Sequence, residues 1–104
     1  MKIDFELSKF YSPGDEARFF SGLRDIRPVK DVTGVGRGIQ VCLDARLLSR
    51  DSLWDLISLL WRYQIPLRPL AVLSKSKKFL WIKGKQFYWH ESMFEKEGVD
   101  PGIK

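Results

Sequence analysis

The spacing of apolar residues in the first part of the chain predicts a strand followed by a helix. Residues 3–7 alternate apolar with polar side chains, the period of a half-buried β-strand. A helix is expected next, because Ser12 can cap its first turn and Pro13 suits its first position. Pro28 ends this helix. Its docking face has helical spacing and contains Phe19, Leu23 and Ile26.

Two further strands are predicted on either side of a glycine-rich turn. Residues 29–33 form the weaker strand, because Lys30 and Asp31 interrupt its apolar pattern. Residues 39–43 alternate cleanly between apolar and polar side chains. The two strands are joined by Gly34-Val35-Gly36-Arg37-Gly38. Its third glycine comes one residue too early for a dinucleotide-binding loop, and a strand follows it, so we interpret it as a hairpin turn.

The second predicted helix has the clearest apolar face of the chain. One of three polar residues can cap its start: Ser49, Asp51 or Ser52. Pro66 ends it, and its apolar face contains Leu53, Leu56, Ile57, Leu60 and Tyr63. Trp54 and Trp61 flank that face, so the helix is expected to touch a second neighbour besides the sheet. We favour the first helix as that neighbour, and a partner protein is the alternative.

The segment that follows the second helix is predicted to contain three short strands. Residues 67–73 form the first, which begins late or lies at a sheet edge because Pro69 cannot donate to a strand ladder. Residues 79–82 and 86–89 are then expected to form a hairpin about Lys83-Gly84-Lys85.

The order of these elements predicts the fold class. Strand, helix, strand, strand, helix, strand is the order of a ferredoxin-like, split βαβ sandwich of the α+β class, here with an extra C-terminal β-hairpin. Two helices would cover one face of an antiparallel sheet and leave the other face open, where a second copy of the chain could form a homodimer. The 104 residues fit a single domain, 1–104, in which residues 95–104 are expected to be a loosely held tail.

Composition argues against several classes of function. No apolar run approaches the roughly 20 residues that a membrane span needs, so no membrane partner is expected. The single cysteine, Cys42, permits no internal disulfide and fits a reducing cytoplasm. His90 is the only histidine, and neither it nor Cys42 belongs to a recognisable metal or catalytic arrangement. We therefore expect no metal, no cofactor, no catalytic residues and no enzymatic activity.

The strongest functional signal is a basic, aromatic stretch. No acidic residue lies between Asp55 and Glu91, but seven cationic residues do: Arg62, Arg68, Lys75, Lys77, Lys78, Lys83 and Lys85. Seven positive charges exceed the net charge of +5, so the rest of the chain sums to −2. The same stretch contains Trp61, Tyr63, Phe79, Trp81, Phe87, Tyr88 and Trp89. Interfaces are enriched in large aromatic side chains and arginine, so this stretch predicts a binding surface.

The predicted hairpin would place the candidate partner-binding residues on one surface: Trp81, Lys83, Lys85, Tyr88 and His90. Lysines would steer the encounter, and aromatic rings would anchor a protein partner. The alternative partner is single-stranded nucleic acid, because cations hold phosphates and aromatic faces stack bases. The acidic residues elsewhere in the chain offer an alternative surface for binding the partner: Asp4, Glu6, Asp15, Glu16, Asp31, Asp44, Asp51 and Asp55.

Three parts of the chain carry a resemblance to a known class of proteins. They are Phe10-Tyr11-Ser12-Pro13-Gly14-Asp15-Glu16 with Phe19-Phe20, Leu48-Ser49-Arg50-Asp51 leading to Leu60-Trp61-Arg62-Tyr63, and Tyr88-Trp89-His90-Glu91-Ser92-Met93-Phe94. The chain resembles the small cytosolic immunity proteins encoded beside bacterial polymorphic toxins, as in contact-dependent growth inhibition systems. The resemblance implies a stoichiometric inhibitor that binds one cognate toxin domain tightly. It concerns fold-forming residues, so no binding residue is taken from it.

Overall fold

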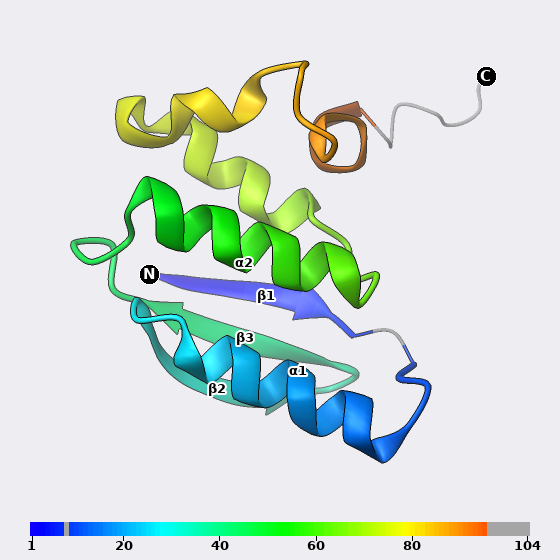
Figure 1. Ribbon diagram of the computed structural model, residues 1–104. Helices are drawn as coiled ribbons and strands as arrows, with labels where there is room; N and C mark the ends of the chain where they lie inside the picture. Colours follow the sequence, from blue (N-terminus) through cyan, green and yellow to red (C-terminus); the bar gives the residue numbers. More distant parts are fainter. Residues whose placement is uncertain (8, 96–104) are drawn as a thin grey trace.

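A computed structural model describes residues 1–7 and 9–95 of the chain (Figure 1). The regular elements are β1 (Lys2–Glu6), α1 (Pro13–Asp25), β2 (Val29–Val35), β3 (Gly38–Leu43) and α2 (Arg50–Arg62). Two 3-10 helices follow, η1 (Arg68–Lys75) and η2 (Lys77–Lys83), and then a single π-helical turn, η3 (Glu91–Glu95). The protein is therefore a mixed α+β domain, as predicted. From residue 96 onward, the predicted tail lies outside the described residues.

The three strands form an open antiparallel sheet in the order β1-β3-β2. β1 and β2 each run antiparallel to β3, so they are parallel to one another and α1 is the crossover between them. The register places Ile3 and Val32 on either side of Val41, and Phe5 opposite Ile39. These inward side chains follow the predicted alternation, which confirms the strands proposed for the first half of the chain.

The predicted glycine turn is shorter in the structure than in the sequence analysis. Gly34 and Val35 belong to β2, and Gly38 begins β3, so only Gly36 and Arg37 make the turn. Gly36 has a φ of 58°, in the left-handed region that a glycine adopts without a steric cost. A hairpin connection was the expected outcome, and it is confirmed.

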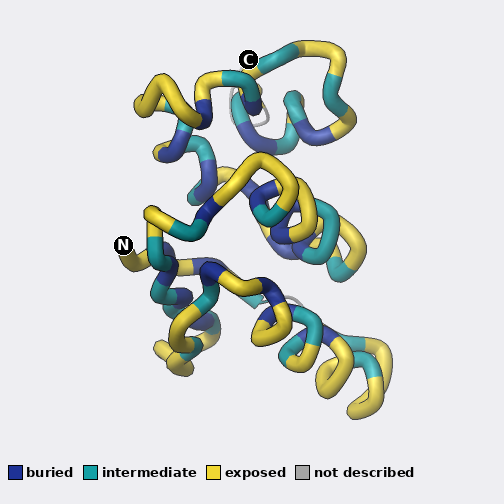
Figure 2. Tube along the Cα trace, turned by 60° about the vertical axis from the view of Figure 1, so that its left-hand side comes forward, coloured by how far each residue is buried: buried dark blue, intermediate teal, exposed yellow. Residues whose placement is uncertain are grey.

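Both regular helices lie on the same side of the sheet (Figures 1 and 2). The Ser12 side chain accepts the Asp15 N–H at 3.0 Å and caps α1. Ser49 is the cap of α2: its hydroxyl accepts the Ser52 N–H at 3.1 Å, while the Ser52 hydroxyl accepts the Ser49 N–H at 2.8 Å. This capping box satisfies two backbone donors at the helix start. No helix within residues 1–7 and 9–95 is long and apolar enough to cross a membrane.

The core lies between the sheet and the two helices and continues into residues 68–95, which comprise η1, η2, η3 and the turns between them and which we call the C-terminal turns (Figure 2). From α1 and α2 it takes the predicted faces: Phe19, Leu23, Ile26, Leu53, Leu56, Ile57 and Leu60. The opposite face of the sheet is not covered by any element of the described chain and carries polar side chains. On that face the Gln40 amide donates to an Asp4 carboxylate oxygen at 3.0 Å.

The strand predicted at residues 67–73 is wrong, because this segment is η1. Pro69 stands in the first turn of that 3-10 helix, a position that needs no N–H donor. The two fully inward leucines, Leu70 and Leu73, are three residues apart, the repeat of a 3-10 helix. η1 contacts β1 at the sheet edge, where a further strand would otherwise pair.

The C-terminal hairpin predicted at residues 79–82 and 86–89 is also not formed. Residues 77–83 are η2, in which the buried Phe79 and Ile82 again have three-residue spacing. Ser76 starts the turn by accepting the Lys78 N–H at 3.2 Å. Both corrections have one cause: short apolar runs fit a strand and a tight helix alike, and the sequence pattern alone does not separate them.

Candidate functional site

The two tryptophans that flank the apolar face of α2 contact the C-terminal turns. Trp54 stacks on Trp81 with ring centroids 5.8 Å apart and planes inclined by 15°. It also meets Phe87 and Trp89 edge to face at 5.4 and 5.2 Å. The neighbour predicted for the second helix is confirmed, because α1 contacts α2; this contact lies on another flank, where a Cβ at Gly22 would lie 3.2 Å from Leu59 Cδ1. The second neighbour of the tryptophans is therefore the segment that follows α2.

A second aromatic contact lies one heptad further along α2. Trp61 meets Tyr88 edge to face with centroids 5.0 Å apart. The Tyr88 hydroxyl is 3.0 Å from the Ser58 hydroxyl, a hydrogen bond that links the turn to α2. Trp61 remains 45% exposed and Tyr88 48% exposed, although each is held by the other. Large aromatic side chains that are fixed in place and still exposed are typical of binding surfaces.

Trp89 is buried beneath the surface and contacts a ring of each pair, Trp54 of the first and Tyr88 of the second. It is fully buried, stacks on Phe87 at 4.4 Å, and meets Tyr88 edge to face at 5.0 Å. Its indole N–H donates to the Ile82 carbonyl at 2.9 Å, which satisfies the one polar atom of the buried ring. Exposed or half-exposed rings therefore surround one buried anchor. We call Trp54, Trp61, Trp81 and Tyr88 the aromatic surface.

The structure brings some of the predicted binding residues together and separates others. Trp81 and Tyr88 both lie against α2, at Trp54 and Trp61 respectively, and do not face each other across a hairpin. Lys83 and Lys85 are exposed on either side of the turn at Gly84.

His90 differs from the other predicted residues, because its side chain is only 14% exposed. Its Nε2 lies 2.7 Å from a Glu95 carboxylate oxygen, and its ring packs beside Phe94. Its Nδ1 is buried and has no hydrogen-bond partner among the described residues. The His90 side chain is therefore mainly packed against Phe94 and Glu95 and presents little surface.

Sequence reasoning did not include Arg50 in the site. Its guanidinium carbon lies 4.3 Å from the Trp81 ring centroid, in the geometry of a cation–π contact. The two residues are far apart in the chain and share no motif, so no local pattern could have paired them. The heptad spacing of Trp54 and Trp61 was a usable signal, because it places two large rings on one flank of a helix.

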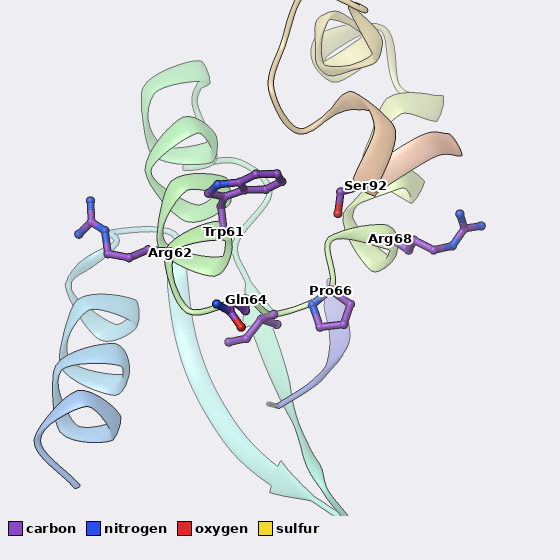
Figure 3. A pocket seen from close by; sticks show the side chains of 7 residues that line it. Trp61, Arg62, Gln64, Pro66, Arg68 and Ser92 are labelled. Atoms are coloured by element: carbon purple, nitrogen blue, oxygen red, sulfur yellow. The ribbon is translucent and has the colours of Figure 1, made fainter. Parts of the chain in front are cut away.

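A groove of about 800 Å³ lies beside the aromatic surface, at the end of α2 (Figure 3). It is lined by Trp61, Arg62, Gln64, Pro66, Arg68 and Ser92, together with Ile65. Figure 3 shows Trp61 and Ser92 on opposite sides, with Gln64 and Pro66 at the turn between them. Arg62 and Arg68 extend away from one another. None of these lining residues is acidic.

The acidic residues gather elsewhere. A separate groove of about 600 Å³ between α1 and α2 includes Asp25, Asp51 and Asp55 among its lining residues. Near the start of α2, hydrogen bonds from the side chain and backbone of Arg46 lower the pKa of Asp44 below its ordinary value. Arg27 and Arg62 line the same groove between α1 and α2, so carboxylates and guanidinium groups are mixed along the two helices.

Comparison with known proteins adds no relative. No protein-family model, no curated protein and no solved structure matches this chain. The function has to be argued from the surface itself.

Proposed function

We propose that this protein is a non-enzymatic, protein-binding inhibitor that acts in the cytoplasm as an immunity protein and neutralises one cognate bacterial toxin domain. The observation that carries the proposal is the aromatic surface, in which Trp61 and Tyr88 are nearly half exposed and still fixed by mutual packing. Rings that are ordered before binding lose little conformational entropy when a partner covers them, so they are efficient anchors.

Charge supports the same surface as a docking site. Lys83 and Lys85 are exposed near the aromatic surface, and no acidic residue occurs between Asp55 and Glu91. A patch of one sign accelerates encounter with a partner of the opposite sign, while buried aromatic contacts slow dissociation. The expected partner surface is therefore acidic around an apolar centre.

The packing of the rings favours a protein over single-stranded nucleic acid. A platform for bases needs free ring faces on which successive bases can stack. Trp54 and Trp81 cover one face of each other, and Arg50 lies over the Trp81 ring. Two of the four rings in the aromatic surface thus have faces already occupied.

We further propose that the domain is a ferredoxin-like sandwich that has lost its last strand. The β1-α1-β2-β3-α2 order and the β1-β3-β2 sheet agree with the first five elements of that fold. In this view η1 takes the place of the fourth strand at the β1 edge, and the C-terminal turns carry the binding surface.

The test is capture of the partner. The full-length chain is immobilised and exposed to lysate of its native host, with and without nuclease, and bound protein is identified by mass spectrometry. We expect one stoichiometric protein that survives nuclease treatment. Capture of nucleic acid alone, with all proteins lost after nuclease, would overturn the proposal and favour a nucleic-acid-binding module.

A charge reversal then assigns the surface. The double variant Lys83→Glu, Lys85→Glu is expected to weaken capture by roughly tenfold and to reduce its sensitivity to salt. The matched control is Lys30→Glu, Arg37→Glu, which makes the same charge change at exposed positions of β2 and its turn. Equal loss in both double variants would mean that net charge, and not this surface, determines binding.

A further inference from the structure

The chain leaves α2 through a residue in an unfavourable backbone conformation. Gln64 has a φ of 60°, the left-handed region that glycine usually occupies after a helix. Its N–H donates to the Trp61 carbonyl at 3.1 Å, and the Ile65 N–H donates to the Leu60 carbonyl at 2.9 Å. These two bonds form a Schellman motif. Glycine would fit this position at a lower conformational cost, but a glutamine side chain is present.

That side chain lines the groove beside the aromatic surface (Figure 3). Trp61, Ile65 and Pro66 supply apolar surface, while the Gln64 amide and the Ser92 hydroxyl supply hydrogen-bonding groups. An apolar hollow with a few polar groups around it suits an extended peptide, which inserts one side chain and offers its backbone to the polar groups. Strained residues that persist in a structure are concentrated at binding sites, which fits the position of Gln64.

The charges at the groove define the peptide further. Arg62 and Arg68 lie at its rim and extend in opposite directions (Figure 3). Within the described part of the chain, Arg62 forms no ion pair with a carboxylate. A peptide that carries an acidic residue beside its inserted side chain would meet the Arg62 guanidinium, and such contacts are stronger than neutral hydrogen bonds.

We propose that this groove binds an acidic peptide segment whose central residue is a large apolar one, such as leucine or phenylalanine. The inference rests on the proposed function, because the segment would belong to the protein partner. Trp61 and Pro66 hold the apolar side chain, Gln64 and Ser92 meet the peptide backbone, and Arg62 meets a flanking carboxylate.

The experiment needs no knowledge of the partner. A display library of randomised peptides of about 12 residues is selected on the immobilised full-length chain. The consensus peptide is then synthesised, and its dissociation constant is measured by calorimetry. We expect enrichment of Asp and Glu around a central Leu, Ile, Phe or Trp. Enrichment of basic or uncharged peptides, or of none, would overturn the inference.

Three variants assign the peptide to the groove. We expect each of three variants to raise the dissociation constant of the peptide by roughly tenfold or more: Trp61→Ala, Arg62→Ala and Gln64→Gly. Gln64→Gly is the decisive variant, because glycine suits the left-handed position and the unfolding midpoint should be unchanged or higher. Arg46→Ala is the control: it removes the same charge before the start of α2, and binding should stay within about twofold.

The possible failures are distinguishable. If Gln64→Gly and Trp61→Ala both leave the peptide affinity unchanged, the groove is not the peptide-binding site, even if the native partner is still captured through the aromatic surface. Peptide binding with no captured partner would support the groove and contradict the proposed function. An oligouridine of about 12 nucleotides that displaces the peptide would assign the groove to nucleic acid instead.

Discussion

The sheet and the C-terminal turns hold their backbones in different ways. In the sheet, hydrogen bonds join residues that are distant in the chain, as where the Leu43 N–H donates to the Met1 carbonyl at 2.7 Å. In the C-terminal turns many of the bonds span three residues. Examples are Phe79 to Ser76 and Gly84 to Trp81, each at 3.1 Å. Local bonds shape each turn but do not fix where it lies on the rest of the molecule.

In the C-terminal turns, the packing of side chains fixes where each turn lies on the rest of the molecule. Phe79, Ile82 and Trp89 are buried, and Trp81 and Tyr88 lie against the α2 tryptophans. The same group of rings therefore positions the segment and forms the aromatic surface. In the sheet, stability and exposed surface belong to different faces, because the buried face stabilises the fold while the polar face is left open. Damage to the rings should accordingly affect structure and binding together, whereas damage to the sheet should affect structure first.

The largest expected effect comes from removing the buried anchor. Trp89→Ala deletes a fully buried ring and its hydrogen bond to Ile82, and should lower the free energy of unfolding by about 3–5 kcal/mol. Urea unfolding followed by circular dichroism measures the loss. Amide exchange should accelerate in residues 77–93 before it accelerates in the sheet. Trp61→Ala is the control, with an expected loss of about 1 kcal/mol or less because that ring is already 45% exposed. Equal losses in the two variants would contradict the anchor role of Trp89.

The sheet should be most sensitive where two backbones approach closely. A Cβ at Gly38 would collide with the Phe5 carbonyl oxygen across the β1–β3 pair. Gly38→Ala is therefore expected to cost about 1–3 kcal/mol, as overpacked cores do. At Gly34 a Cβ would meet nothing within 4 Å, so Gly34→Ala should be neutral or stabilising by about 0.5–1 kcal/mol. Thermal unfolding of the two variants measures the difference. A Gly38 variant as stable as the wild type would show that the strand pair adjusts freely.

The contrast between the two regions also explains what the sequence could predict. In the first region, strands and helices have different periods, and caps such as Ser12 and Ser49 mark the helix starts, so element types and order were predictable. In the second region, apolar residues recur in runs of three or four between prolines and lysines. Such runs fit a strand or a 3-10 turn, and the choice depends on α2, which lies far away in the sequence.

The candidate site was predictable only in part for the same reason. The charge and aromatic content of residues 56–90 pointed to the correct side of the molecule for Trp81 and Tyr88. The partners of these rings, Trp54 and Trp61, become apparent only once η2 is folded back on α2. The groove depends on the left-handed turn at Gln64, and a glutamine there gives no sequence signal for such a conformation.

The smallest expected effect concerns a polar contact in the loop before α2, and it should leave both regions intact. Asp44 accepts hydrogen bonds from the Arg46 backbone N–H, Nε and Nη2 at 3.0, 3.2 and 3.1 Å, and these bonds lower the pKa of Asp44 below its ordinary value of 3.8. A carboxyl with a lowered folded-state pKa stabilises the fold above its unfolded pKa, and this contribution is lost as pH falls through the folded pKa.

Because the Arg46 side chain is 90% exposed and the pair is screened by solvent, the change in stability should be too small to detect by unfolding. Carbon-detected NMR titration of the Asp44 carboxyl should show the lowered pKa directly, and Arg46→Ala should return it toward 3.8. Chemical shifts of the Trp81 and Tyr88 amides should not follow this titration. If they did, a loop contact outside the aromatic surface would help to position the C-terminal turns, and aromatic packing alone would not account for their placement.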